Sequence, residues 1–230
     1  MGAVTICLMV GGFLLAANYS GQCSRILYLG EAASVTVALI GLLQKLGYDP
    51  LGLLKGYVVG DWEYTHMLTT LGNNNWLSGY YSVMFPLSLA LFCKAVEEER
   101  RGSSMLLGAS NILVVILLFL QGSDGGVMVT GVALWMCFWS SRKKTKLWEA
   151  MLFLLAGVCV GMLLWGKGMQ SLGTFDILLQ DGIAKWLTAW QGWILLAAMF
   201  LLFCGIHHVL PDEKKRMLRT GLLYGSLAFA

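Results

Sequence analysis

The sequence predicts an all-α protein, a polytopic bundle of transmembrane helices with about seven or eight spans and no soluble domain. Hydrophobic residues make up 57% of the 230 residues, and the mean hydropathy is +0.70. Only 13% of the residues are charged, against roughly 25% in an average soluble domain. A chain of this length could not cover so much apolar surface in water, so a lipid bilayer is the expected solvent. We expect residues 1–230 to form a single membrane domain.

Apolar runs recur along the chain and define the expected spans. Seven runs are complete, and an eighth reaches the last residue. They cover Ala3–Ala17, Ile26–Leu43, Trp76–Cys93, Met105–Gln121, Gly126–Ser140, Ala150–Trp165, Thr188–Ile206 and Thr220–Ala230. Several are shorter than the ~20 residues of an ideal span. Tryptophans near the run ends fit the aromatic belt of a membrane–water interface and extend these runs.

Basic residues are distributed unequally between alternate loops, which predicts an orientation. Twelve lie in the loops after the first, third, fifth and seventh runs: Arg25, Lys94, Arg100, Arg101, Arg142, Lys143, Lys144, Lys146, Lys214, Lys215, Arg216 and Arg219. The other loops hold Lys55, Lys167 and Lys185, with Lys45 at a run boundary. The first set is therefore expected in the cytoplasm, and the N-terminus outside. No basic patch alternates with aromatic residues, so we expect no nucleic-acid partner.

Familiar catalytic and metal-binding patterns are absent from the sequence. It contains no HExxH, GxxxxGK[ST] or GxGxxG pattern, and its six cysteines have no C-x-x-C spacing. His66, in an expected outer loop with Asp61 and Glu63, is either a general base or an ordinary loop histidine, and no metal-ligand spacing accompanies it. We therefore expect neither a metal ion nor another cofactor.

The most informative polar segment covers residues 71–81 and contains three adjacent asparagines. It opens the third run and so belongs at the outer face. Capping of a helix that begins at Trp76, by Asn74 or Asn75, needs one amide. Three amides exceed that need, and helix N-termini also attract anions such as phosphate. We favour capping combined with ligand contact over capping alone.

Two carboxylates lie in or beside the expected spans. Asp124 belongs to a glycine-rich turn, Gly122–Gly126, and we interpret it as a solvated turn residue. Glu31 lies inside the second run, about one turn from its cytoplasmic end. A carboxylate within a span is a functional candidate, whereas a shallow depth allows solvation at the interface. Both interpretations of Glu31 stay open.

Two segments together resemble the O-antigen ligase and polymerase family of bacterial membrane glycosyltransferases. The first combines Leu42–Pro50 with Leu71–Tyr80, similar to a span that ends in Gln and Gly and is followed by G-N-x-N, an aromatic and a small residue. The second is Leu117–Gly126, where the family typically has Thr-x-Ser-Arg-Gly. Asp124 stands in place of the family's arginine. The matching positions are Gly72, Asn73, Asn75, Trp76, Ser78, Ser123 and Gly125.

The resemblance implies transfer of a glycan from a polyprenyl-diphosphate carrier to an acceptor at the outer face of a bacterial plasma membrane, in cell-surface polysaccharide assembly. Family members are longer than this chain, so the implied glycosyltransferase would need a C-terminal part, either in the same protein or as a separate partner half. The other expected partners are the carrier-linked glycan and the lipid bilayer. The alternative is a non-catalytic membrane protein, such as a transport or flippase-like partner or an inactive remnant.

The resemblance points to no catalytic residue in this chain. Cationic side chains usually compensate a leaving diphosphate, which adds the three outer lysines to the matching positions. The candidates for binding the glycan and the lipid diphosphate are Gly72, Asn73, Asn75, Trp76, Ser78, Ser123, Lys55, Lys167 and Lys185.

Overall fold

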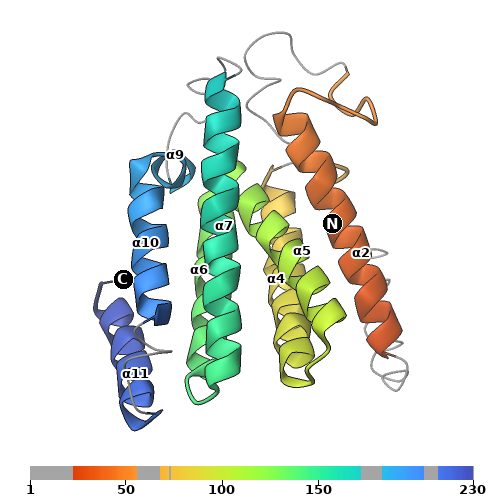
Figure 1. Ribbon diagram of the computed structural model, residues 1–230. Coiled ribbons are helices and arrows are strands. Elements are labelled where there is room, and N and C mark those ends of the chain that lie inside the picture. Colours follow the sequence, from red (N-terminus) through yellow and green to blue (C-terminus); the bar gives the residue numbers. More distant parts are fainter. Residues whose placement is uncertain (1–22, 56–67, 73, 172–182, 205–211, 230) are drawn as a thin grey trace.

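Each apolar run in the described part of the chain forms a helix (Figure 1). The computed structural model describes residues 23–55, 68–72, 74–171, 183–204 and 212–229, and these ranges are all-helical apart from turns. The first run, Ala3–Ala17, lies outside the described residues. The helices are α2 (Cys23–Lys45), α4 (Asn74–Glu97), α5 (Arg101–Leu120), α6 (Asp124–Ser141), α7 (Thr145–Ser171), α9 (Ile183–Thr188), α10 (Trp190–Cys204) and α11 (Asp212–Phe229).

Four described helices, α2, α4, α5 and α7, are long and apolar enough to cross a bilayer. Their spans are Ile26–Lys45, Asn75–Glu97, Arg101–Leu120 and Thr145–Ser171. The remaining spans expected from the sequence correspond to the shorter helices α6, α10 and α11 and to the first run. Helix α11 begins with a charged segment at Asp212, and the eighth run forms only its second half.

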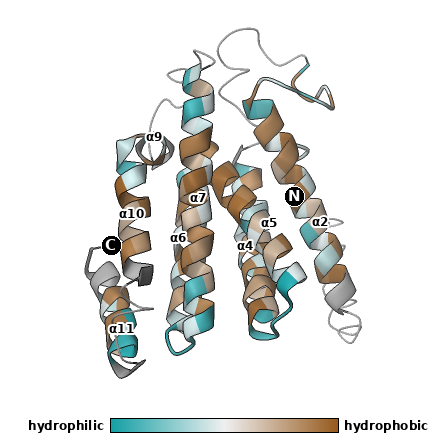
Figure 2. Ribbon diagram, viewed as in Figure 1, coloured by the Kyte–Doolittle hydropathy of each residue, from teal (hydrophilic) through white to brown (hydrophobic). Residues whose placement is uncertain are grey.

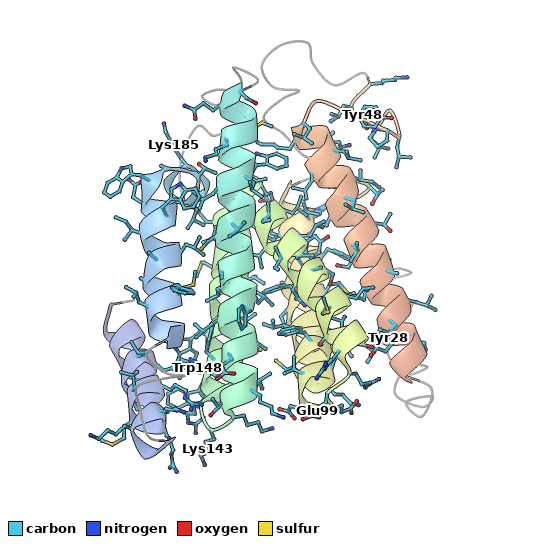
Figure 3. All side chains as sticks on the ribbon, viewed as in Figure 1. Tyr28, Tyr48, Glu99, Lys143, Trp148 and Lys185 are labelled. Atoms are coloured by element: carbon cyan, nitrogen blue, oxygen red, sulfur yellow. The ribbon has the colours of Figure 1, made fainter. Side chains whose placement is uncertain are left out.

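The helices run alternately up and down, so the most basic loops meet at one end (Figure 1). Lys144 Nζ lies 2.6 Å from Glu97 Oε1, which joins the start of α7 to the end of α4. Arg219 Nη2 on α11 donates to Thr145 Oγ1 at 2.8 Å. We call this end, formed by the α4–α5 and α6–α7 loops and the start of α11, the basic end. Figure 3 shows Glu99 and Lys143 here, and Tyr48 and Lys185 at the opposite end.

The core is centred on α4. Its side chains Leu77, Tyr81, Phe85 and Leu89 recur every four residues, so they share one helix face, and none is more than 1% exposed. This face packs against α5 and α6. Many large apolar side chains point outwards instead, among them Met105, Met128, Phe153 and Phe200. Hydrophobic residues thus line the helices along their length while hydrophilic ones gather towards the ends (Figure 2), as a lipid environment requires.

Close backbone contact joins α7, α9 and α10 at the opposite end. A Cβ atom at Gly166 would lie 2.6 Å from Thr188 Cβ, and one at Gly192 would lie 2.0 Å from the carbonyl oxygen of Leu187. Small residues permit such approach between membrane helices. Helix α9 is short, and residues 172–182 before it lie outside the described part of the chain.

We predict that Gly192→Ala lowers the free energy of unfolding by about 1–3 kcal/mol, because the added methyl group overlaps the backbone of α9. Unfolding in mixed micelles, followed by tryptophan fluorescence, measures this. Gly131→Ala is the matched control, since a Cβ there meets nothing within 4 Å. Equal stabilities of the two variants would contradict the close packing of α9 and α10.

Candidate functional site

A buried polar cluster joins α4, α5 and α6 at the opposite end. Gln121, directly after α5, donates from Nε2 to Ser78 Oγ on α4 at 2.9 Å. Ser78 in turn donates to Ser123 Oγ, at the start of α6, over 3.2 Å. Ser78 and Gln121 are both buried. The structure therefore connects the start of α4 with the turn before α6, through two of the predicted site residues, Ser78 and Ser123.

The turn between α5 and α6 is shorter than the sequence predicted. Gly122 has φ 71°, a conformation that suits glycine, and the chain reverses over Gln121–Ser123. Helix α6 then begins at Asp124, so Gly125 and Gly126 are helical instead of forming part of the turn. Asp124 is exposed, as expected, but it occupies the first helical turn, where its negative charge is favoured by the helix dipole.

A second network anchors the chain that leads into the asparagine segment. The fully buried Gln44, at the end of α2, accepts the backbone N–H of Thr69 at Oε1 over 2.8 Å. Its Nε2 donates to Asp49 Oδ1 at 3.3 Å, and Asp49 Oδ2 accepts the N–H of Leu54 at 2.7 Å. One amide side chain thus holds the turn after α2 and the segment before α4 to the same helix end.

Positive backbone φ angles then direct the chain into α4. Thr69 has φ 50° and Gly72 has φ 76°. Thr69 compensates for this uncommon conformation, since its Oγ1 accepts the N–H of Leu71 at 3.2 Å. Gly72, one of the predicted site residues, therefore has a conformational role in positioning the start of α4.

The asparagine segment opens α4 earlier than expected. The helix begins at Asn74 instead of Trp76, so Asn75 lies within its first turn and is exposed. Trp76 is also exposed, at 70% of its surface. Asn73 and the side chain of Asn74 lie outside the described residues.

The three candidate lysines all lie at the opposite end but on two sides of it. Lys167 Nζ lies 5.3 Å from the ring centroid of Trp193, between α7 and α10. Lys185 is exposed on the neighbouring helix α9 (Figure 3). Lys55 is exposed in the turn region after α2, and Figure 1 shows α2 on the side of the bundle away from α9 and α10. The structure brings together the regions of Lys167 and Lys185, and it leaves Lys55 apart from them.

Three buried polar side chains, Gln44, Gln121 and Glu31, stand apart from the predicted site residues. Gln44 and Gln121 each end an apolar run, and that placement was the available sequence signal for them. Glu31 is only 5% exposed and lies within hydrogen-bond distance of the hydroxyl groups of Ser88 and Ser110, so it is buried between helices and not solvated at an interface.

The described residues contain no group of three or more His, Cys, Asp or Glu side chains that could hold a metal ion. Cys93, Cys137 and Cys159 are free thiols. The outer-loop candidates Asp61, Glu63 and His66 lie outside the described residues.

No family model, no curated protein and no solved structure matches this chain. The helices themselves define the class of protein: a helical membrane protein whose polar side chains form networks between helices.

We predict that Gln44→Leu lowers the free energy of unfolding by about 1–3 kcal/mol, because the buried N–H of Thr69 loses its acceptor. Unfolding in mixed micelles measures the change, and limited proteolysis between α2 and α4 should speed up. Gln170→Leu is the control, since Gln170 is exposed at the end of α7. If Gln44→Leu and Gln170→Leu both had the stability and proteolysis rate of the unaltered protein, the Gln44 network would not anchor this segment.

The environment of Asp49 predicts that the folded protein loses stability as the pH falls into the acid range. Desolvation raises the pKa of this carboxyl group, but hydrogen bonds from the N–H of Leu54 and the Gln44 amide outweigh it and leave the pKa below its ordinary value. A depressed pKa contributes stability that is present above the ordinary pKa of about 3.9 and is lost as the pH falls through the folded-state value. Asp49→Asn should remove this part of the acid dependence in melting curves recorded over a range of pH. The prediction would be contradicted if the variant lost as much stability in acid as the unaltered protein does.

Proposed function

We propose that this chain is a multi-pass bacterial plasma-membrane protein that binds a polyprenyl-diphosphate-linked glycan at the extracytoplasmic face, in the manner of an O-antigen ligase or polymerase. One observation carries the proposal. The hydrogen bonds of Gln121, Ser78 and Ser123 join the two family-like segments into a single polar cluster at one end of the bundle.

The charge distribution supports the orientation. The basic end holds the α4–α5 and α6–α7 loops and the start of α11, and the positive-inside rule assigns such loops to the cytoplasm. The polar cluster lies at the other end of the same helices and therefore faces the outside. An extracytoplasmic N-terminus follows if the first run also spans the membrane.

Helix geometry supports an anionic ligand. Helices α4 and α6 pack together, and both begin at the opposite end, so their N-terminal N–H groups and positive dipole ends face the same region. Ser78 and Ser123 lie within these two helix starts. Lys167 and Lys185 add positive charge on the α7–α9 side. A diphosphate headgroup at the interface matches this set of donors.

A second candidate function is carrier binding without glycan transfer, and Asp124 favours it. This carboxylate is exposed in the first turn of α6, at the position where the family-like motif has an arginine. A negative charge there opposes the charge that develops on a leaving diphosphate. Incubation of the protein with a carrier-linked glycan and an acceptor separates the two functions, since only an enzyme releases polyprenyl diphosphate.

We predict that Ser78→Ala weakens binding of a fluorescent polyprenyl-diphosphate-linked glycan to the full chain in nanodiscs by about tenfold, equivalent to about 1.4 kcal/mol. The reason is that Ser78 is the centre of the hydrogen-bonded cluster. Ser140→Ala is the matched control, because Ser140 is an exposed helical serine near the basic end.

The lysines extend the same binding measurement. Lys185→Ala should weaken binding, and the affinity of this variant should depend less on salt concentration than that of the unaltered protein. Lys143→Ala at the basic end should leave the affinity unchanged. Identical affinities for Ser78→Ala, Lys185→Ala and the unaltered protein would refute carrier binding at this end.

A further inference from the structure

Glu31 occupies a junction of three helices away from the proposed glycan site. It belongs to α2 and lies within hydrogen-bond distance of Ser88 on α4, at 2.8 Å, and of Ser110 on α5. All three side chains are more than nine-tenths buried. One turn further along α2, the backbone carbonyl of Ser34 accepts the hydroxyl of Tyr81 at 2.7 Å. Among the described carboxyl side chains, Glu31 alone is buried.

The junction lies deep in the apolar part of the bundle. Ser88 is nine residues before Glu97 at the end of α4, and Ser110 is nine residues after Arg101 at the start of α5. At about 1.5 Å per residue, both lie about 13 Å from the charged basic end. A hydrocarbon core is about 30 Å thick, so this depth is inside it.

Positive charge does not compensate Glu31 within the described part of the chain, where no lysine, arginine or histidine forms an ion pair with it. Tyr80 and Tyr81, on one of the helices packed against α2, interact with Glu31 electrostatically, and phenols supply no positive charge. The other titratable groups on the two helices packed against α2 are Cys93, Lys94, Glu97 and Arg101. Burying an ionised carboxylate without a cation is costly, and two hydroxyl donors offset only part of that cost.

The number of hydrogens available to Ser110 also favours a protonated Glu31. The Ser110 hydroxyl lies within reach of two acceptors, Glu31 and the carbonyl oxygen of Leu107 at 3.1 Å, but it has one hydrogen to donate. A proton on Glu31 resolves this conflict. The carboxyl group then donates to Ser110, Ser110 donates to Leu107, and Ser88 donates to Glu31.

We propose that Glu31 is a proton-binding site inside the membrane, where a neutral carboxyl group links α2 to α4 and α5. The ligand is a single proton, held by one carboxyl and two hydroxyl groups. Loss of the proton would place an uncompensated charge where α2 meets its two neighbours, so protonation of Glu31 controls the docking of α2. This inference is independent of glycan binding, because the site lies on other residues.

Reaction with an apolar carbodiimide tests the proposal on the full chain in liposomes. A protonated carboxyl group in apolar surroundings adds through oxygen to the carbodiimide carbon, its proton moves to nitrogen, and rearrangement gives a stable N-acylurea. We expect mass spectrometry to locate this adduct on Glu31 and its yield to fall as the pH is raised. Glu97→Gln is the control and should leave the adduct unchanged, because Glu97 is exposed and paired with Lys144.

Infrared spectroscopy provides a second measurement that does not depend on reagent access. The protonated carboxyl C=O stretch should be present in the unaltered protein and missing in Glu31→Gln, which preserves the side-chain shape. Ser110→Ala should shift this band to higher frequency, because the carboxyl group loses its acceptor. Absence of both the adduct and the band would overturn the proposal. Suppression of the adduct by sodium, but not by choline, at constant pH would also overturn it, since the site would then take a metal cation.

Discussion

Hydrogen bonds between side chains of different helices determine how this bundle is assembled. Lipid satisfies the apolar surface of a membrane helix as well as another helix does, so apolar contact alone specifies little about which helices meet. Polar side chains buried among apolar ones have no such alternative, because an unpaired donor or acceptor is costly away from water. Glu31 and Gln121 therefore carry more information about the arrangement of the helices than the many leucines around them.

The polar contacts at the two ends of the bundle differ in kind and in effect. At the basic end, exposed ion pairs such as Lys144 with Glu97 join loops, and each contributes little because water competes for the charges. At the opposite end, buried hydrogen bonds of Gln44 and Ser78 order the segments that begin α4 and α6. Rigid positioning of chain ends is what a binding site needs, whereas exposed ion pairs only link neighbouring loops.

The sequence predicted the helices well because an apolar run in lipid must satisfy its own backbone hydrogen bonds, and a helix does so within the segment. It predicted their ends less well. Helix α4 continues to Glu97 and α7 to Ser171, because polar and charged residues can continue a helix beyond its apolar run, where their side chains reach water. Partners such as Ser110 for Glu31 are 79 residues apart, and no local pattern encodes that contact.

Asp124 shows how helix stability and the proposed ligand make opposite demands on one position. An acidic residue in the first turn stabilises a helix by about 0.3–1 kcal/mol, and an arginine there would be unfavourable. The same carboxylate opposes a diphosphate near the start of α6. In the proposed function, attraction for the carrier must therefore come from the start of α4 and from the lysines on α7 and α9, with Gln121 and Ser78 holding the helix starts in place. The neutral donors among these groups bind a ground state without stabilising the charge on a leaving diphosphate, so carrier binding without transferase activity is consistent with them.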